Sequence, residues 1–241
     1  MQPLADSGIA TLPLDVNDEK SIGDALGHVR NEAGALDVLV NNAGFSQVGA
    51  VVDLTRDDLR RQYETNVIAP VAMTRAAMDL LRAAVARCGR ASVVNVGSIV
   101  GTFTTPFAGA YCSSKAALHS LSDALRMELQ PLGIDVIIVQ PGGIRSAFGD
   151  HAEEAIQLPE DSLFKPVEKG IRARAQAGQQ GATAAEEFVV QVADGLLRDK
   201  PPVIIRGGKN SLRLPLLQKL LPVRSFDAMM QKNFGLNRLQ P

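Results

Sequence analysis

The chain has 241 residues, of which 46% are hydrophobic and 21% charged, and its formal net charge is −1. We expect one domain over residues 1–241, and the near-neutral charge gives no indication of a nucleic-acid partner. The two cysteines, Cys88 and Cys112, form no CxxC pair, so the sequence predicts no metal site and a cytoplasmic location, where thiols stay reduced.

Short apolar runs alternate with helical patterns in the first part of the chain. Ile9–Leu14 predicts a strand that ends at Asp15, and Asp18–Glu32 predicts an amphipathic helix. Leu36–Val40 predicts a second strand, which Asn41–Gly44 closes. This alternation is typical of α/β folds.

A long helical stretch covers Asp57–Ala86, and Thr55 is its candidate N-cap. Pro70 lies inside this stretch and has no N–H to donate, so we expect the helix to kink or split near Asn66. Ser92–Val96 then predicts a third strand.

Helices and strands continue to alternate beyond this point. Tyr111–Leu129 predicts a helix, Asp135–Gln140 a fourth strand and Val203–Ile205 a weaker fifth. Continuous apolar strands separated by helices indicate a parallel sheet that helices cover on both faces. The sequence therefore predicts a doubly wound α/β fold.

Two C-terminal regions depart from this pattern. Residues 147–190 begin with a stretch, Ala147–Gly181, rich in Ala, Gln, Gly and charge, and we expect a substrate lid here, with a plain surface excursion as the alternative. Residues 211–236 hold many large apolar side chains with interleaved bases. We expect tail helices packed on the body or on a partner subunit, and a lipid-facing surface is the alternative.

Tyr111 and Lys115 lie four residues apart on one predicted helix, so their side chains share a face. A lysine cation beside a phenol favours phenolate, which predicts a lowered pKa for Tyr111 and a role as acid or base. Taken alone, such a pair is more often an exposed contact.

Small or polar residues follow four predicted strands and strengthen this interpretation. They are Asp15, Asn41–Gly44, Ser98 and Pro141–Gly142. Ligands of parallel α/β sheets bind at the carboxyl ends of the strands. We therefore expect a ligand site at this rim of the sheet.

These motifs, in this order and spacing, resemble the single-domain short-chain dehydrogenase/reductase family from about Ile9 to Ser146. The resemblance implies a Rossmann-like fold. The matching residues are Asp15-Val16, Asn41-Asn42-Ala43-Gly44, Asn66 within Glu64-Thr65-Asn66-Val67, Ser98 within Gly97-Ser98-Ile99, Tyr111 and Lys115 in Tyr111-Cys112-Ser113-Ser114-Lys115, and Pro141-Gly142.

The resemblance implies four catalytic roles. Tyr111 is the general acid of reduction and the base of oxidation, and Lys115 lowers its pKa and holds the nicotinamide ribose. Ser98 donates a hydrogen bond to the substrate oxygen. Asn66 holds a water that joins Lys115 to solvent.

The resemblance also implies NADP or NAD as cofactor. Asp15 contacts the adenine, Asn42 the adenine ribose region, and the backbone of Ile144 the nicotinamide amide. Ser146 stands where the family usually has threonine. The full set implied for cofactor binding is Asp15, Val16, Asn42, Ala43, Gly44, Tyr111, Lys115, Pro141, Gly142, Ile144 and Ser146.

One family element is missing from the sequence, the glycine-rich turn that carries the pyrophosphate after the first strand. The only glycine before Gly23 is Gly8, and neither GxGxxG nor GxxxGxG occurs. We therefore expect the first two strands to be missing and an apolar sheet edge to be uncovered. Two explanations fit the missing element, a start assigned too late and a true truncation. The resemblance of Met1–Leu4 to the end of a helix favours the first.

The sequence thus predicts an NAD(P)-dependent oxidoreductase that acts on a carbonyl or alcohol. Family members with such apolar tails resemble steroid, retinol or acyl-lipid oxidoreductases, so the resemblance implies an apolar substrate of this kind. It also implies a homodimer or homotetramer. A non-catalytic fragment that only binds partner subunits is the alternative. A nucleotide-sugar epimerase or dehydratase shares the Tyr–Lys pair, but Asn41–Gly44 and the short C-terminal region argue against it.

Overall fold

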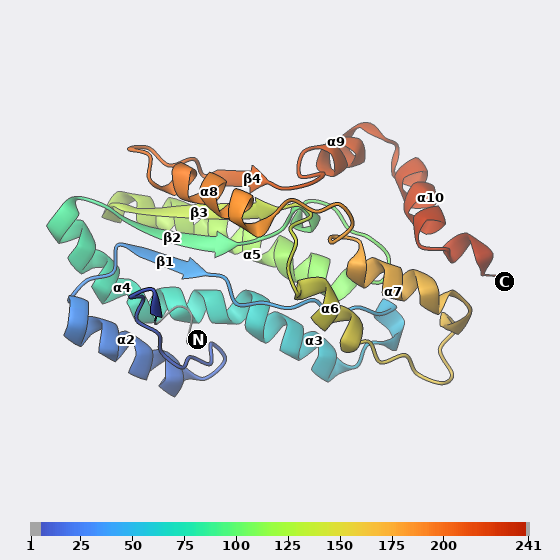
Figure 1. Cartoon of the computed structure of the whole chain (residues 1–241), viewed down its shortest axis with the longest axis horizontal. Coiled ribbons are helices and arrows are strands. Elements are labelled where there is room, and N and C mark those ends of the chain that lie inside the picture. Colours follow the sequence, from blue (N-terminus) through green and yellow to red (C-terminus); the bar gives the residue numbers. More distant parts are fainter. Residues whose placement is uncertain (1–5, 240–241) are drawn as a thin grey trace.

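The computed structural model describes residues 6–239, so the interpretation of Met1–Leu4 as a helix end lies outside it. The described residues form a four-stranded parallel sheet in the order β1-β2-β3-β4 (Figure 1). The strands are β1 (Val38–Asn41), β2 (Ala91–Val96), β3 (Ile134–Pro141) and β4 (Ile204–Gly207).

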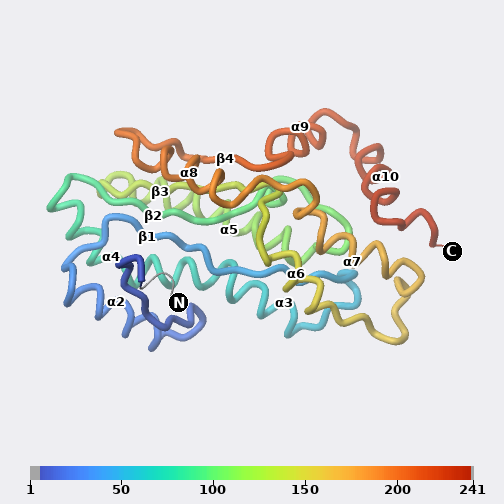
Figure 2. The backbone as a smooth tube through the Cα atoms, viewed as in Figure 1, coloured from blue at the N-terminus to red at the C-terminus, as the bar shows by residue number. Residues whose placement is uncertain are grey.

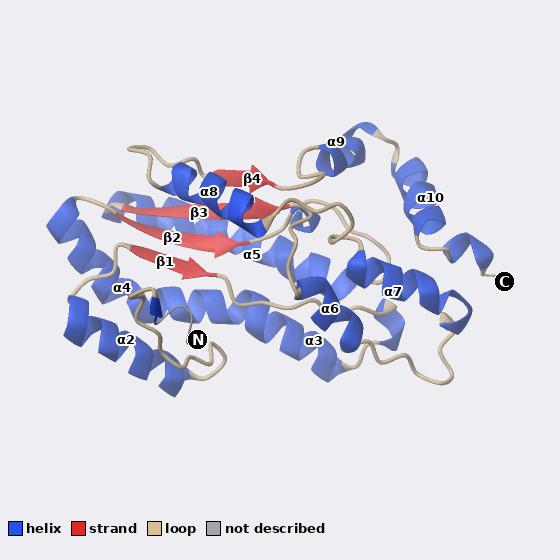
Figure 3. Ribbon diagram, in the orientation of Figure 1, coloured by secondary structure: helices blue, strands red, loops and turns tan. Residues whose placement is uncertain are grey.

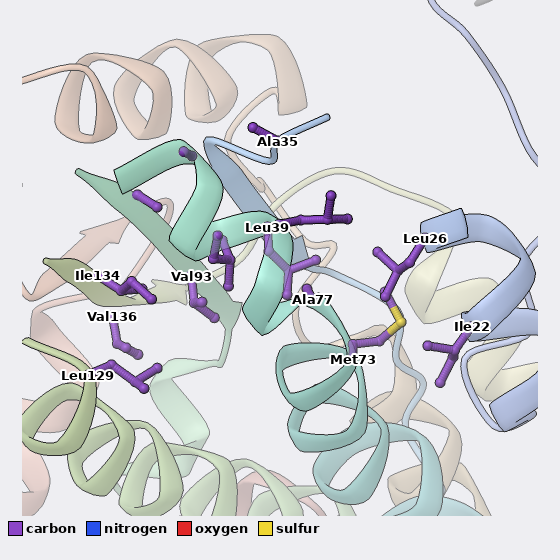
Figure 4. Packing of buried hydrophobic residues seen from close by; sticks show 14 residues of the cluster. Ile22, Leu26, Ala35, Leu39, Met73, Ala77, Val93, Leu129, Ile134 and Val136 are labelled. Carbon is purple, nitrogen blue, oxygen red and sulfur yellow. The ribbon is translucent and has the colours of Figure 1, made fainter. Parts of the chain in front are cut away.

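One face of the sheet packs on a layer of helices that carries the main core. Figure 4 shows Leu39 and Val93 of the strands directed toward Met73 and Ala77, with Leu26 beside them. All five side chains are at most 8% exposed, so this layer is a dry core. The layer comprises α2 (Glu19–Ala33), α4 (Ala69–Cys88) and α5 (Gly109–Leu129).

The opposite face is covered only in part. Helix α8 (Ala185–Leu196) lies over the strands on this face (Figure 3). Its Phe188 packs against Val94 and other strand residues. Over β1, by contrast, Val38 and Val40 are 41% and 50% exposed. The prediction of helices on both faces is therefore correct for β2 to β4 and wrong for β1 in the described part of the chain.

The strand predicted at Ile9–Leu14 does not form. This segment runs without regular structure beside α2, where Leu12 and Pro13 line a surface hollow with Lys20 and Asp24. An extended segment becomes a strand only when a partner strand satisfies its backbone hydrogen-bonding groups. A high β-propensity alone is therefore not sufficient. The predicted Rossmann-like α/β class with an incomplete sheet is confirmed for residues 6–239.

The long helix splits where the sequence predicts. Thr55 caps α3 (Arg56–Tyr63) in a reciprocal capping box with Asp58. A π-helical turn, Glu64–Ile68, then separates α3 from α4. Pro70 cannot donate to the carbonyl four residues earlier, that of Asn66, which explains why the regular helix is interrupted there.

Between β3 and residue 239 the chain forms α8 and β4 at the sheet and four further helices beyond the carboxyl ends of the strands (Figure 2). These helices are α6 (Phe148–Glu154), α7 (Glu168–Gln176), α9 (Arg213–Leu220) and α10 (Val223–Asn233). None of the helices within residues 6–239 combines the length and apolarity needed to cross a membrane.

The tail packs on the body. Phe226 and Met230 of α10 are each 6% exposed and contact Ile99 and Phe103. Gly170 of α7 lies so close to the tail that an added Cβ would collide with the backbone oxygen of Phe234. The packing of tail helices on the body is therefore the arrangement observed.

The Gly170 contact predicts how the tail is held. We expect Gly170→Ala to lower the free energy of unfolding by about 1–3 kcal/mol, because the new methyl displaces backbone. Gly23→Ala is the matched control, since an added Cβ there meets nothing within 4 Å and alanine favours the helix by up to about 1 kcal/mol. Urea unfolding and hydrogen exchange over residues 226–234 measure both. Equal stability of the two variants with an unchanged tail would contradict the contact.

Candidate active site

The site lies at the carboxyl rim of the sheet, where three parallel strands end together. The register pairs Asn41 with Asn95 and Val96 with Val139. Consequently Asn42–Gly44, Ser98 and the segment after Pro141 leave the sheet side by side. The register agrees with the expectation of a shared rim for Asn41–Gly44, Ser98 and Pro141–Gly142, but Asp15 follows no strand, because Ile9–Leu14 forms none.

A buried chain of polar side chains fixes this rim relative to α5. The amide of Asn41 donates to Asn95 Oδ1 at 2.8 Å, and the amide of Asn95 donates to Ser122 Oγ at 2.9 Å. All three residues are at most 8% exposed. A fully paired buried network specifies one arrangement, so Asn41 serves the scaffold while Asn42 remains exposed at the rim.

Lys115 is buried beneath this rim, with 5% of its surface exposed. Its ammonium donates to the backbone oxygen of Val96 at 2.6 Å. A Cβ added to Gly44 would lie 3.7 Å from Lys115 Nζ and 3.2 Å from Asn66 Oδ1. Lys115, Asn66 and Gly44 therefore converge from α5, the π-turn and β1. Burial lowers the pKa of Lys115 from 10.5 to about 8.

Asn66 is 1% exposed, and neighbouring chain segments satisfy its side chain. Its Oδ1 accepts from the Phe45 N–H at 3.2 Å, and its Nδ2 donates to Phe45 O and to Ser114 Oγ, both at 3.1 Å. The π-turn thus ties the loop after β1 to the helix that carries Lys115. π-turns inside α-helices are often found at functional sites.

Tyr111 differs from the sequence-based expectation in the direction of its pKa. Burial raises the pKa of the phenol above 10.0, while contact with Ser98 and the positive charge of Arg174 act to lower it. Lys115 Nζ lies 5.9 Å from the centroid of the Tyr111 ring. Desolvation of the phenolate therefore outweighs the nearby charges, and the prediction of a lowered pKa is wrong for this structure.

Ser98 is held by a residue that the sequence reasoning passed over. Its backbone N–H donates to His119 Nε2 at 3.4 Å. An added Cβ at Gly97 or Gly101 would collide with the His119 ring, so the ring fills a slot between two glycines. Burial, with the charge of Lys115, lowers the pKa of His119 to about 4. The signal was present, because His119 follows Lys115 by four residues on the same helix.

The segment after β3 is built for close backbone approach. Gly142 donates to the backbone oxygen of Gly207 at 2.8 Å, and a Cβ at Gly142 would collide with the oxygen of Lys209. Ile144 pairs with Thr183. Only glycine therefore fits at position 142, where this segment passes the residues that follow β4.

Ser146 follows β3 and Asp15 precedes α2, and other segments of the chain hold both. The backbone N–H of Ser146 donates to Gln179 Oε1 at 3.0 Å. Asp15 and Val16 lie in the turn before α2, where Asp15 Oδ1 accepts from the Asn17 N–H at 2.9 Å. Asn17 in turn reaches Thr65 Oγ1 at 3.1 Å. The turn is thereby tied to the π-turn that contains Asn66.

Two side chains of residues 147–190, Phe148 and Arg174, contact the segments around the site. The ring of Phe148 lies 5.7 Å from the Tyr111 ring, centroid to centroid. Arg174 of α7 donates through Nε to Thr105 Oγ1 at 2.6 Å. Neither residue stood out in the sequence, because only the fold brings α6 and α7 to the segment after β2.

The comparisons with known proteins agree with this geometry. A family model for short chain dehydrogenases matches residues 2–157. The chain belongs to the short-chain dehydrogenase family. Short-chain dehydrogenase cctT of Talaromyces islandicus is 30% identical over 238 residues, covering 96% of this chain and 81% of that protein.

Two further members extend the comparison. The NADPH-dependent 3-dehydrocapnine reductase of Ornithobacterium rhinotracheale is 30% identical over 239 residues, covering 92% of this chain and 80% of that protein. A solved short-chain dehydrogenase from Streptomyces avermitilis superposes with a TM-score of 0.75 at 30% identity, covering 98% and 83% of the two chains. The predicted family and enzyme class, an NAD(P)-dependent oxidoreductase, are confirmed.

The residues present fit one half of such a cofactor. An added Cβ at Gly44 would lie 3.2 Å from Asn66 Oδ1 and 3.7 Å from Lys115 Nζ, so a ligand that contacts the Gly44 backbone would also lie near these two polar groups. The phosphate half has no counterpart in the sequence, because no glycine-rich turn of the family spacing occurs. The residues present thus fit the nicotinamide half of the cofactor and not its phosphate half.

The burial of Lys115 predicts a measurable cost in stability. At pH 7 the buried cation destabilises the native state by about 3 kcal/mol, the equivalent of the fall in pKa from 10.5 to about 8. We expect Lys115→Met to remove that cost but to leave Val96 O without a donor, so that the net gain is about 1–2 kcal/mol.

The direction of the pH dependence of this stability gain follows from the two pKa values of Lys115. The native state releases the proton near pH 8 and the unfolded state near 10.5, so wild-type stability rises between these values and the advantage of Lys115→Met shrinks. Urea unfolding at pH 7 and pH 10.5 measures the difference. Lys169→Met, at an exposed position of α7, is the control. A gain that does not change with pH would refute a buried cation.

Proposed function

We propose that this chain transfers hydride between a nicotinamide cofactor and a carbonyl or alcohol substrate, with Ser98, Tyr111, Lys115 and Asn66 as its catalytic residues. The convergence of Lys115 and Asn66 on Gly44 supports this proposal most directly. Three segments far apart in the sequence meet there, on the side of the sheet where ligands of this fold bind.

The side chains of Tyr111 and Ser98 have different roles in the proposed carbonyl reduction. The Tyr111 phenol donates its proton to the substrate oxygen, and the Ser98 hydroxyl donates a hydrogen bond to the same oxygen as negative charge develops. Because burial raises the pKa of Tyr111, the phenol is protonated at neutral pH and ready to act as an acid. The bound nicotinamide supplies or accepts the hydride.

Cofactor binding is assigned to the rim. The proposed contacts are Asp15, Val16, Asn42, Ala43, Gly44, Tyr111, Lys115, Pro141, Gly142, Ile144 and Ser146. The dependence of the 3-dehydrocapnine reductase on NADPH favours NADPH as the first cofactor to test, with NADH second.

The substrate is proposed to be apolar near its reacting carbon. Val48 and Phe107 are 2% and 4% exposed and form an apolar cluster with Ile171 of α7. Residues 147–190 are proposed as the substrate lid, with Phe148 closing on Tyr111. Steroid-, retinol- and acyl-lipid-like carbonyls are the proposed substrates, and the half-buried residues packed against this cluster, Ile156, Leu158 and Phe164, are the proposed contacts for their apolar carbons.

Assembly and location complete the proposal. Helices α4 and α5 are the proposed interface of a homodimer or homotetramer, since exposed apolar residues on α5 include Leu121 and Met127, 38% and 63% exposed. Two free thiols, at Cys88 and Cys112, favour a reducing compartment such as the cytoplasm.

A non-catalytic fragment is the second candidate. The exposed valines of β1 and the missing glycine-rich turn favour it. The two candidates make different predictions for cofactor binding by the chain as given.

Titration of NADPH, then NADH, into the purified chain separates them, with nicotinamide fluorescence as the signal. The chain has no Trp, so protein emission interferes little. We expect saturable binding, and we expect Tyr111→Phe to keep it while turnover of apolar ketones falls by about 10²–10⁴-fold, because only the proton donor is lost. Absence of binding to either cofactor would favour the fragment, and an active Tyr111→Phe enzyme would refute the role of Tyr111.

A further inference from the structure

Arg174 is a charged side chain over the site that hydride transfer does not use. It is half-buried on α7, and its Nε donates to Thr105 Oγ1 at 2.6 Å. None of the ion pairs within residues 6–239 involves it. Arg172, two residues earlier on the same helix, is exposed and pairs with Glu168 at 2.8 Å.

The surroundings of Arg174 direct it toward the substrate. Its neighbours on the helix, Ile171 and Ala175, are 0% and 8% exposed and belong to the apolar cluster with Phe107. Thr105, also 8% exposed, lies in the segment between Ser98 and Tyr111. The guanidinium is therefore held on the substrate side of the rim.

A half-buried cation without a carboxylate partner costs free energy unless a ligand pairs with it. Guanidinium carries five N–H donors, and the Nε–H is the one bound to Thr105. Its two NH₂ groups retain donors that match the two oxygens of a carboxylate. A single hydroxyl partner such as Thr105 orients the group without neutralising it.

We propose that Arg174 binds a carboxylate of the substrate, so that the substrate class is a carbonyl or alcohol that also carries a carboxylate on an apolar chain. The inference rests on the proposed function and narrows it. Tyr111 and Ser98 hold the reacting oxygen, Arg174 holds the acid group, and half-buried apolar residues packed against the cluster contact the carbon chain between them. Thr105 is a positioning residue that acts through Arg174.

A cofactor phosphate is a less suitable partner for this arginine. The cofactor rim is formed by Asn42–Gly44 and the segment after β3, whereas Thr105 belongs to the segment that leads into α5. The test nevertheless includes the cofactor, so that the two sources of negative charge are distinguished.

The experiment measures binding to the full chain without cofactor, and so does not depend on turnover. Calorimetric titration at pH 7 compares 4-oxooctanoate and 5-oxooctanoate with their methyl esters. We expect the acid to bind more tightly than its ester in wild type, and Arg174→Gln to lower the affinity for the acid about tenfold while that for the ester is unchanged. Arg172→Gln, the matched control, keeps the preference for the acid.

Three outcomes would overturn the proposal. Equal losses in Arg174→Gln and Arg172→Gln would show a general charge effect. If Arg174→Gln still prefers the acid, and Thr105→Val and Arg174→Gln are destabilised equally, the Arg174–Thr105 hydrogen bond has only a structural role. Loss of NADPH binding in Arg174→Gln with the acid preference kept would assign the charge to the cofactor.

A parallel turnover assay keeps this inference separate from the proposed function. Reduction of an apolar ketone without a carboxylate by the wild-type chain supports hydride transfer whatever Arg174 does. If acid binding depends on Arg174 but no ketone is turned over, the carboxylate site is supported and the proposed hydride transfer is refuted.

Discussion

The site depends on one buried interaction, the hydrogen bond from the Lys115 ammonium to the oxygen of Val96 at 2.6 Å. It joins α5 to the end of β2 at the level where Gly44 approaches both Lys115 Nζ and Asn66 Oδ1. A buried cation is costly, and the fall of its pKa to about 8 measures that cost. A fold tolerates such a cost most readily at a functional position, where a ligand is the missing partner.

Much of this arrangement could be predicted because it is encoded locally. Continuous apolar runs gave the strands that form β1 to β4, and Pro70 gave the helix break at Asn66. Once the strands are parallel and in register, the residues that follow them must share one rim. The spacing of Tyr111 and Lys115 on one helix then brings both side chains to that rim.

The remaining features arise only from tertiary contact. Ile9–Leu14 has the composition of a strand, yet a strand exists only with a partner for its backbone, and none of the described residues provides one. The direction of the Tyr111 pKa depends on burial, which spacing does not report. Arg174 meets Thr105 across 69 residues of sequence, so no local pattern could place it at the site.

The balance of charge around Tyr111 connects these features. Lys115 Nζ lies 5.9 Å from the centroid of the Tyr111 ring, and the positive charge of Arg174 acts to lower the pKa of the phenol. Burial acts in the opposite direction and has the larger effect, so the phenol is protonated at neutral pH. A neutral acid between two cations is therefore suited to donate a proton to an oxygen that is becoming an anion.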